Sequence, residues 1–549
     1  MSDPEQQATE NEPPSGRSRY PVMLDPRRLL HTWEAATALM LASAPTVGDP
    51  FGLAKVLPVW FRWRAHPVGA LVAAAARHPR RTALIDDEGA ITFEALNRET
   101  NALARAWHKA GHGSGTTVGI LCEPSRTFLI ASIAAQKLGA DVVYLNAAFS
   151  APQVADVVQG EGIDALVYDS HLTHAATLAT GCVKISERDL MTSVAGVSSG
   201  PLRPPSEGPG RTVVLTSGTT GRPKGAQRRA NGGPLDAAGL LACLPVQSGD
   251  RIVVAAPLFH GLGLMGATLG LALSSTVIVR RKFDPETTLQ DIATNRATVL
   301  VAVPVMLQRI LALPATRRAS YPLSDLRIVL CGGAALSAEL ALRFMDEFGD
   351  VLYNFYGSTE AGWATCAAPR DLRAAPGTAG RPTPGVAVRI ADESGRGVPV
   401  GTTGRVLVGS RLRMDNYTDG GGKEIVDGLV ATGDVGHFDQ ARRLFIDGRE
   451  DEMIVSGGEN VFPAEVEEVL FAHPAIAEAA AIGVPDSEYG QRLRAFVVRA
   501  SGAEISEEEI KRYVHDRLAR FKTPREVVFI DALPRTATGK VLKRELAKL

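Results

Sequence analysis

The sequence predicts an α/β protein. A large N-terminal domain, made of two parallel-type α/β subdomains and a small β-rich subdomain, is followed by a small α+β C-terminal domain. Three observations indicate this architecture. The length of 549 residues exceeds what one hydrophobic core supports. From residue 67 to about 384, short β-rich runs alternate with longer helical runs, which is typical of parallel sheets covered by helices. Short strands and turns then follow, and beyond residue 448 a compact α+β pattern begins.

Composition along the chain sets the expected boundaries. Residues 1–20 are polar, contain proline and lack the apolar stretch of a signal peptide, so we expect a disordered tail. Residues 21–65 form an apolar-rich extension. The N-terminal domain is expected to cover residues 66–448, and the C-terminal domain residues 449–549.

Periodicity predicts the individual elements of the large domain. Its clearest helices are expected at Glu94–Ala110 and Thr127–Leu138. Short runs rich in β-branched residues predict strands at Ala83–Asp86, Thr92–Phe93, Thr117–Cys122, Asp141–Leu145, Ala165–Tyr168, Thr212–Thr216, Arg251–Ala256, Thr276–Arg280, Val299–Val303 and Ile328–Cys331.

The C-terminal domain is expected to combine two helices with three strands. Ser506 precedes three glutamates and an apolar run, which predicts a capping box at the start of the second helix. The predicted elements are helices at Pro463–Phe471 and Ser506–Leu518 and strands at Ala477–Gly483, Leu493–Arg499 and Glu526–Ile530.

Charge and cysteine usage narrow the class of protein. The formal net charge of −1 gives no electrostatic reason to expect nucleic acid as a partner. The five cysteines are scattered without a CxxC pair, which argues against a disulfide framework or a zinc site and predicts a cytoplasmic protein. No 18-residue run is free of polar residues and turn formers, so no transmembrane segment is expected.

The apolar extension could contact either a membrane surface or the protein's own large domain. Residues 56–64 carry Trp60, Phe61 and Trp63 among arginines, a composition compatible with peripheral membrane contact. Packing on the protein's own large domain is favoured, because the stretch is short and shows no clear helical periodicity. A homodimer is also left open.

A glycine-rich loop at residues 213–226, VVLTSGTTGRPKGA, follows a predicted strand. Glycines let backbone N–H groups approach an anion, hydroxyls add donors and a lysine adds a compact positive charge, so the loop is suited to binding polyphosphate. Its spacing differs from the Walker A pattern. The alternative is a flexible linker, but the apolar strand before the loop favours a binding site. The candidate phosphate-binding residues are Thr216, Ser217, Gly218, Thr219, Thr220, Gly221 and Lys224.

The segment TSGTTGRPKG resembles the phosphate-binding signature of the adenylate-forming, or AMP-binding, superfamily, and within it the acyl-CoA synthetases. Four further motifs of that family follow in order, and the resemblance runs from about residue 67 to the end of the chain. It implies ATP, Mg²⁺ and coenzyme A as cofactors and co-substrate, a small-molecule carboxylic acid as substrate, and a mobile C-terminal lid domain.

The second and third motifs imply a nucleotide site. In NFYGSTE, the resemblance places Tyr356 against adenine, gives Gly357 a close backbone approach and Thr359 a phosphate contact, and makes Glu360 the Mg²⁺ ligand. One carboxylate is chemically sufficient, since Mg²⁺ otherwise prefers phosphate oxygens and water. In ATGD, Asp434 matches the family residue that binds the ribose hydroxyls; by itself a TGD sequence is more often a β-turn.

The last two motifs lie in the expected C-terminal domain. Arg449 matches an arginine that contacts ribose or phosphate, and Asp451 falls at the family's hinge position. Many relatives have aspartate where Glu452 stands and tyrosine where Phe462 stands. In LPRTATGK, Lys540 matches the lysine that reaches the carboxylate and the α-phosphate during adenylation. The residues implied for coenzyme A binding are Ser456, Gly457, Gly458 and Glu459.

Two more segments resemble walls of the family's site: PLFHGLG with His260 borders the acyl site, and the stretch with Gly332, Gly333 and Ala334 matches a segment that forms part of the adenine and acyl walls, which makes these three residues candidates for ATP or AMP binding. A lone histidine in an apolar stretch is more often a core residue. The expected catalytic residues are Lys540, Thr219, Glu360 and His260. The expected acyl pocket is formed by His260, Gly261, Gly263, Leu264, Val305, Gly357 and Gly362.

Together these features predict an ATP-dependent acid–CoA ligase, which forms acyl-AMP with release of pyrophosphate and then acyl-CoA. The apolar walls favour a medium- or long-chain fatty acid, with an aryl acid as the alternative. Transfer to a separate carrier protein is a further alternative, although no carrier domain follows in the chain. An amino-acid substrate is disfavoured, because no aspartate stands between Pro257 and Gly263 to hold an ammonium group. A catalytically inactive nucleotide- or lipid-binding relative is the remaining alternative.

Overall fold

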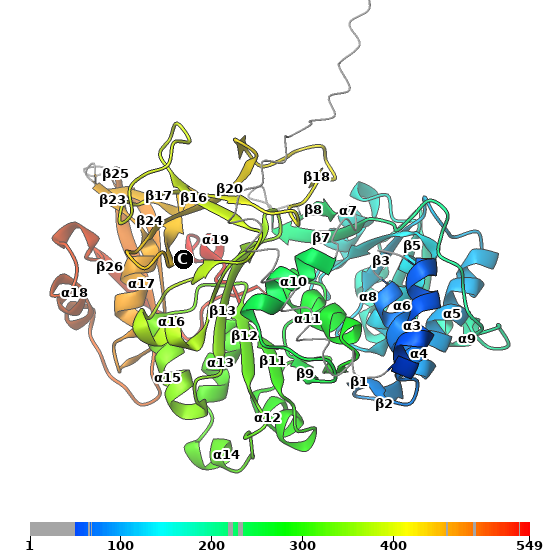
Figure 1. The fold of residues 1–549 in the computed structure, drawn as a ribbon. Coiled ribbons are helices and arrows are strands. Elements are labelled where there is room, and N and C mark those ends of the chain that lie inside the picture. The colour runs from blue at the N-terminus through cyan, green and yellow to red at the C-terminus, as the bar shows by residue number, and fades with distance from the viewer. Residues whose placement is uncertain are drawn as a thin grey trace, which may run out of the picture.

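The computed structural model describes residues 50–63, 66, 68–217, 223–228, 234–456, 459–486, 490–536 and 539–549. The predicted tail at residues 1–20 and most of the extension that follows it lie outside the described residues. Two large sheets and two small ones organise the rest (Figure 1).

The largest sheet has nine strands in the order β15-β14-β13-β12-β11-β9-β10-β1-β2. The strands from β13 to β1 run parallel, while β2, β14 and β15 pair antiparallel at the two edges. β11 reads VLVA and is buried at every position, as a central parallel strand requires. The bounds are β1 Thr82–Asp86, β2 Gly89–Thr92, β9 Arg251–Val254, β10 Thr276–Ile278, β11 Val299–Ala302, β12 Ile328–Gly332, β13 Leu352–Ser358, β14 Gly362–Ala367 and β15 Arg381–Pro382.

The second sheet has seven strands in the order β18-β8-β7-β4-β3-β5-β6. β7, β4, β3, β5 and β6 are parallel, and β8 returns antiparallel to β7. The bounds are β3 Thr117–Leu121, β4 Asp141–Tyr144, β5 Ala165–Tyr168, β6 Val183–Ser186, β7 Thr212–Ser217, β8 Pro223–Arg228 and β18 Asn416–Tyr417.

Helices cover both large sheets, and α5, α6, α9, α12 and α15 each begin at a residue whose side chain accepts from a free backbone N–H. Ser125 and Ser337 accept from Phe128 N and Leu340 N at 3.4 and 3.2 Å. The bounds are α3 Pro50–Trp63, α4 Gly69–Arg77, α5 Phe93–Lys109, α6 Arg126–Leu138, α7 Ala151–Gly160, α8 Thr173–Ala176, α9 Glu187–Ser193, α10 Pro234–Cys243, α11 Gly261–Ala272, α12 Pro285–Thr294, α13 Pro304–Leu311, α14 Ala315–Ala319, α15 Ala338–Phe348 and α16 Pro369–Ala374.

Two small sheets complete the molecule. The third has the order β16-β17-β20-β19 with β21 on β20, and the fourth the order β23-β22-β25-β24 with β26 on β25. Ser506 and Glu509 form the predicted capping box at the start of α18. The bounds are β16 Ala387–Ala391, β17 Gly404–Gly409, β19 Ile425–Val426, β20 Leu429–Phe438, β21 Leu444–Arg449, β22 Ile454–Ser456, β23 Glu459–Val461, α17 Pro463–Phe471, β24 Ile476–Asp486, β25 Gly490–Arg499, α18 Glu507–His515, β26 Glu526–Phe529 and α19 Lys543–Leu546.

The predicted fold class is therefore confirmed, with two parallel-type sheets, a β-rich part and a smaller α+β part. The exact domain boundaries stay predictions. The third sheet ends at Arg449 and the fourth begins at Ile454, so the transition falls within a few residues of the expected one. One strand prediction needs a correction, because Phe93 begins helix α5 rather than continuing β2.

The aromatic stretch near residue 60, whose sequence shows no clear helical periodicity, is helical in the structure. It forms the end of α3, and Trp63 is only 3% exposed, with its ring 5.1 Å from that of His66. This burial supports packing on the protein's own domain for Trp63, while Phe61 is 70% exposed. Arg64 lies outside the described residues.

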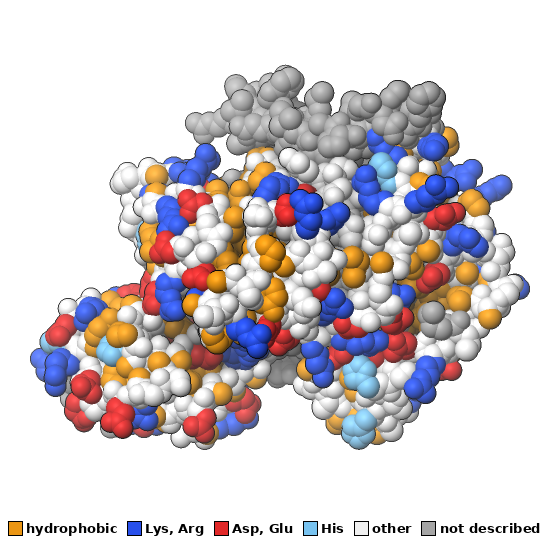
Figure 2. All heavy atoms as spheres, turned by 90° about the horizontal axis from the view of Figure 1, so that it is seen from below, with side chains coloured by type: hydrophobic (Ala, Val, Ile, Leu, Met, Phe, Trp, Pro, Cys, Tyr) orange, Lys and Arg blue, Asp and Glu red, His pale blue; other side chains and the backbone are white. Residues whose placement is uncertain are grey.

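The surface carries both charges. On the face shown in Figure 2, Lys and Arg side chains are interspersed with Asp and Glu, in keeping with the small net charge. Among the described residues, none of the helices is long and apolar enough to cross a membrane.

Candidate active site

The glycine-rich loop connects β7 to β8 in an antiparallel hairpin, in which Thr216 lies opposite Lys224. The Nζ atom of Lys224 lies 3.2 Å from Asp419 Oδ2 and 5.6 Å from the centre of the Tyr417 ring. The structure thus places Lys224 at the start of β8, directly after the loop. Gly218, Thr219, Thr220 and Gly221 lie outside the described residues, and the side chains of Thr216 and Ser217 are not described either.

A second part of the site joins residues from three separate motifs. The Tyr356 hydroxyl donates to Asp434 Oδ2 at 2.5 Å, and Arg449 Nη1 lies 3.3 Å from Asp434 Oδ1. Asp434 and Arg449 are directly opposite each other on β20 and β21. The family resemblance implies these three residues from three different motifs, and the structure brings them into one hydrogen-bonded cluster.

Burial governs the electrostatics of this cluster. Burial raises the pKa of Asp434, while the hydrogen bond from Tyr356 and the charges of Arg449, Lys540 and Lys423 act in the opposite direction. Burial and the neighbouring Asp434 carboxylate raise the pKa of Tyr356 well above its ordinary value. The phenol therefore stays a hydrogen-bond donor, and the carboxylate keeps lone pairs for hydroxyl groups of a ligand.

Glu360 lies in the connection between β13 and β14. Its Oε1 accepts a hydrogen bond from the Tyr417 hydroxyl at 2.7 Å, and its backbone carbonyl accepts from Met414 N at 2.8 Å. The preceding carbonyl, of Thr359, accepts from Arg228 Nη2 at 2.5 Å. At Gly357 a Cβ would come within 2.4 Å of the Gly362 carbonyl oxygen, so this tight hairpin requires glycine there.

Lys540 is presented by a tight turn near the end of the chain. Thr536 N donates to Lys540 O at 2.8 Å, and Arg535 Nη1 donates to Gly539 O at 2.6 Å. A Cβ on Gly539 would lie 2.4 Å from Val305 Cγ1, so the turn packs against the start of α13. The charge of Lys540 acts on both His260 and Asp434. The structure therefore gathers residues of the last motif and of the acyl and nucleotide walls in one place.

His260 follows β9 and stands at the N-cap position of α11 without a side-chain capping hydrogen bond, and its ring centre lies 4.6 Å from that of Phe259. Burial, assisted by the charge of Lys540, lowers the pKa of His260 to about 4. The imidazole is therefore neutral at physiological pH. It offers one N–H donor and an uncharged aromatic wall rather than a second cation.

This neutral imidazole leads to a prediction. We expect His260→Phe to lower the rate of ATP–pyrophosphate exchange but to leave the shape of its pH profile unchanged between about pH 5.5 and 8. The shape is unchanged because His260 in the folded protein does not titrate in that range. Below an unfolded-state pKa of about 6.5 only the unfolded chain takes up this proton, so the contribution of His260 to stability declines as the pH falls. An inflection near pH 6.5 in the wild type that His260→Phe removes would contradict the assignment.

The remaining predicted wall residues gather at the carboxyl ends of neighbouring strands. Gly332 ends β12, Val305 follows β11, and Gly362 begins β14. Parallel strands end at the same edge of a sheet, and β14 begins there because it pairs antiparallel with β13, so these positions lie along one edge. In the wall segments 260–264, 305–307, 332–335 and 357–363, Glu360 is the single charged residue. The other predicted wall residues are Gly261, Gly263, Leu264, Gly333, Ala334 and Gly357.

The hinge and the coenzyme A loop are described in part. Arg449 Nε donates to Asp451 Oδ1 at 2.9 Å, which ties the expected hinge residue to the nucleotide cluster. Glu452 pairs with Lys543 at 2.7 Å. Ser456 and Glu459 lie opposite each other in the β22–β23 hairpin. The side chains of these two residues are not described, and Gly457 and Gly458 lie outside the described residues.

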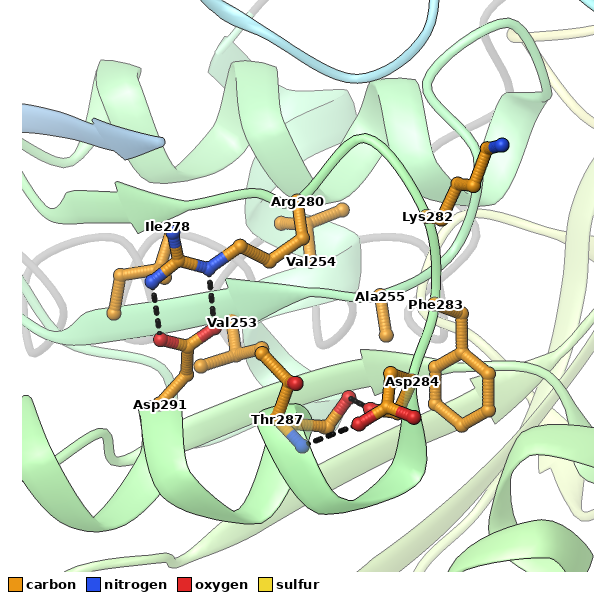
Figure 3. Close-up of a pocket in the computed structure, with 11 residues that line it drawn as sticks. Val253, Val254, Ala255, Ile278, Arg280, Lys282, Phe283, Asp284, Thr287 and Asp291 are labelled. Carbon is orange, nitrogen blue, oxygen red and sulfur yellow. Dashed lines mark hydrogen bonds and ion pairs between the residues drawn. The ribbon is translucent and has the colours of Figure 1, made fainter. Parts of the chain in front are cut away.

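A separate pocket lies beside β9, β10 and the start of α12 (Figure 3), and none of the predicted site residues lines it. Arg280 donates to both oxygens of Asp291, at 2.8 and 2.6 Å, and Asp284 accepts from Thr287 N at 2.7 Å as the cap of α12. These charged groups are satisfied within the protein, so we assign them a structural role.

The clustered residues fit a magnesium nucleotide. Asp434 supplies an acceptor for hydroxyl groups, Lys224 and Lys540 supply positive charge for phosphates, and Glu360 supplies the carboxylate oxygen that Mg²⁺ prefers. Sequence reasoning missed Arg228 and Tyr417, which hold the Glu360 loop. Arg228 could have been found, because it stands four residues after Lys224 on the same strand. Nothing in the sequence near Tyr417 points to a role in the site.

Known proteins with similar sequences match most of this chain. The AMP-binding enzyme family matches residues 71–418, and the AMP-binding enzyme C-terminal domain matches residues 465–540. A feruloyl-CoA synthase of an Amycolatopsis species is 34% identical over 487 residues, which cover 87% of this chain and 97% of that protein. An indoleacetate–CoA ligase of Aromatoleum aromaticum is 38% identical over 354 residues, which cover 63% of this chain and 69% of that protein.

The fold is also found among solved structures. ATP-bound MatB from Rhodopseudomonas palustris superposes with a TM-score of 0.80 at 28% sequence identity, over 88% of this chain and 98% of that one. The first family match covers both large sheets, and the second lies within the small C-terminal part. The described residues of the site include at least one residue from each of the five motifs. This chain therefore belongs to the family of AMP-binding enzymes, as an adenylate-forming acid–CoA ligase that uses ATP, Mg²⁺ and coenzyme A.

Proposed function

We propose that the acid substrate carries an aromatic or fused ring on the chain that bears its carboxyl group. The observation that carries this proposal is the aromatic, uncharged character of two of the predicted wall segments and the residues beside them. Phe259 and His260 lie on one wall, with His260 neutral, and Phe355 and Trp363 on another, with ring centres 6.2 Å apart. Aromatic side chains favour edge-on or offset contacts with a ring. The two relatives named above are a feruloyl-CoA synthase and an indoleacetate–CoA ligase, which supports this substrate class.

A medium- or long-chain fatty acid is the second candidate. The same walls carry no charged group besides Glu360, and space is open beside Gly261 and Gly333, where a Cβ would meet no atom closer than 3.7 Å; backbone carbonyl groups fill the corresponding space at Gly263. Each buried methylene contributes about 0.8 kcal/mol. Glu360, which we propose holds Mg²⁺, is the single carboxylate in these segments, so an ammonium group would be left unpaired and would cost several kcal/mol to bury, which disfavours amino acids.

The chemistry proposed for the site follows from its charges. A carboxylate and ATP are both anions, so the site has to bring them together and stabilise the charge that develops on the α-phosphate. Lys540 and Lys224 would supply fixed positive charge, and Asp434 with Tyr356 would orient the nucleoside. Glu360 would hold the Mg²⁺ that accompanies the phosphates and neutralises their charge. We further propose that the C-terminal domain turns about Asp451 before the thioester forms.

A substrate panel tests the proposal. We expect the best ring-bearing acid, among benzoate, phenylacetate, coumarate, ferulate and indoleacetate, to exceed any straight-chain acid from acetate to palmitate by at least about tenfold in kcat/KM. AMP release should depend on coenzyme A, which separates this acceptor from a carrier protein. Highest activity on a fatty acid would overturn the ring assignment and keep the apolar pocket, whereas highest activity on an amino acid would refute the pocket argument.

A further inference from the structure

We propose that Tyr417 is a positioning residue, which holds the carboxylate of Glu360 in the orientation needed to bind Mg²⁺ during adenylation. The inference rests on the proposed role of Glu360 and adds a residue that none of the motifs contains. The Tyr417 hydroxyl donates to Glu360 Oε1 at 2.7 Å, and this contact joins the two large sheets at the nucleotide site.

The location of Tyr417 gives this contact its importance. Tyr417 belongs to β18, which pairs with β8, the strand that leaves the glycine-rich loop; Tyr417 lies opposite Ala226. Glu360 belongs to the β13–β14 connection of the other large sheet. Met414, three residues before Tyr417, donates its backbone N–H to the Glu360 carbonyl at 2.8 Å. One short segment therefore holds Glu360 by its backbone and by its side chain.

The ring of Tyr417 is fixed. It is 9% exposed and packs in a small core with Ala226 and Met414, so the hydroxyl has little freedom to leave Glu360. The hydroxyl donates to Glu360 Oε1 at 2.7 Å, so the packed ring holds one oxygen of the carboxylate in place.

A donor on one carboxylate oxygen is what a Mg²⁺ ligand needs. Mg²⁺ demands nearly ideal octahedral geometry, and the groups that hydrogen-bond to a metal ligand set the ligand's orientation. With Oε1 held by Tyr417, the carboxylate cannot rotate freely, and lone pairs of Oε2 can face a cation. Arg228 reinforces the same loop through its 2.5 Å hydrogen bond to the Thr359 carbonyl.

The same segment also reaches the other expected phosphate contact. Asp419, two residues after Tyr417, pairs with Lys224 at 3.2 Å. Residues 414–419 therefore contact both the residue proposed for Mg²⁺ and the lysine proposed for phosphate. This arrangement accounts for a buried tyrosine hydroxyl at a position that packing alone would fill equally well with phenylalanine.

The test is Tyr417→Phe, which keeps the ring and removes only the hydroxyl. We expect the rate of ATP–pyrophosphate exchange to fall by about tenfold, and the Mg²⁺ concentration for half-maximal rate to rise by about three- to tenfold, since loss of such a supporting contact weakens metal binding. Tyr321→Phe is the matched control, because the Tyr321 hydroxyl donates to Glu286 Oε1 at 3.0 Å away from the site. The control should leave both quantities unchanged.

Glu360→Gln and the double variant decide between explanations. If Tyr417 acts through Glu360, Tyr417→Phe should cost less than about twofold in the Glu360→Gln background. Additive losses would overturn the positioning role, as would an unaltered Mg²⁺ dependence in Tyr417→Phe when Glu360→Gln raises it. An unaltered Mg²⁺ dependence in Glu360→Gln itself would instead refute the proposed metal role of Glu360, and an equal shift in Tyr321→Phe would show that the effect is not specific to the site.

Discussion

Lys540→Ala is expected to lower the rate of acyl-adenylate formation by at least ~10²-fold, the usual cost of removing one preorganised electrostatic donor. The structure supports a role in this half-reaction, because the turn that carries Lys540 packs against Val305 and its charge acts on His260 and Asp434. A cation at this place can face both the substrate carboxylate and the α-phosphate. The measurement is ATP–pyrophosphate exchange with the best acid from the panel.

Measuring the second half-reaction shows whether Lys540→Ala removes one specific charge or damages the whole site. A presynthesised acyl-adenylate should still react with coenzyme A in Lys540→Ala at a rate within about threefold of the wild type, since the proposed second conformation moves Lys540 away. Lys548→Ala is a suitable control, because Lys548 is an exposed lysine of the same terminus that pairs with Glu545. Equal losses in both half-reactions would contradict the two-conformation assignment.

The order of elements in the fold could be predicted because most strands carry a local signal. β5 and α17 occupy the predicted ranges, and β11 and β12 differ from theirs by one residue at one end. β8 and β13 were missed as strands. Their sequences contain Pro223, Gly225, Gly357 and Ser358, which are turn formers, and here pairing with neighbouring strands outweighs local preference. The helix ending at Trp63 was missed; it contains Pro58, a residue that disfavours the interior of a helix.

The candidate site was predictable where a motif carries the chemistry and not where packing does. Tyr356, Asp434 and Arg449 come from three motifs and lie in one cluster. Nothing in a single sequence connects Tyr417 with Glu360, because the contact depends on how β18 adds to the edge of β8. The neutral state of His260 could likewise not be predicted from the sequence, since it follows from burial and from the charge of Lys540, which is distant along the chain.

Asp434→Asn is expected to raise the KM for ATP by roughly 10- to 100-fold, with much less change in kcat. The substitution keeps the shape of the side chain and removes its charge, so hydrogen bonds from ribose hydroxyls lose about 1.5–3 kcal/mol. Arg449, whose Nη1 lies 3.3 Å from Asp434, would also lose a charged partner. A contact made equally to the bound nucleotide and to the transition state affects KM rather than kcat.

Deoxynucleotides show whether the lost contact is with the ribose. In the wild type, 2′-deoxy-ATP or 3′-deoxy-ATP should raise KM by a factor similar to that of the substitution, because each lacks a hydroxyl that would donate to Asp434. In Asp434→Asn the same deoxynucleotides should add less than about threefold, since the charged acceptor is already gone. Asp439→Asn is the control, because Asp439 pairs with Arg443 at 2.7 Å at the far end of the same hairpin. A full additional penalty for both deoxynucleotides in Asp434→Asn would place the ribose elsewhere and leave Asp434 as a partner of Tyr356 and Arg449 only.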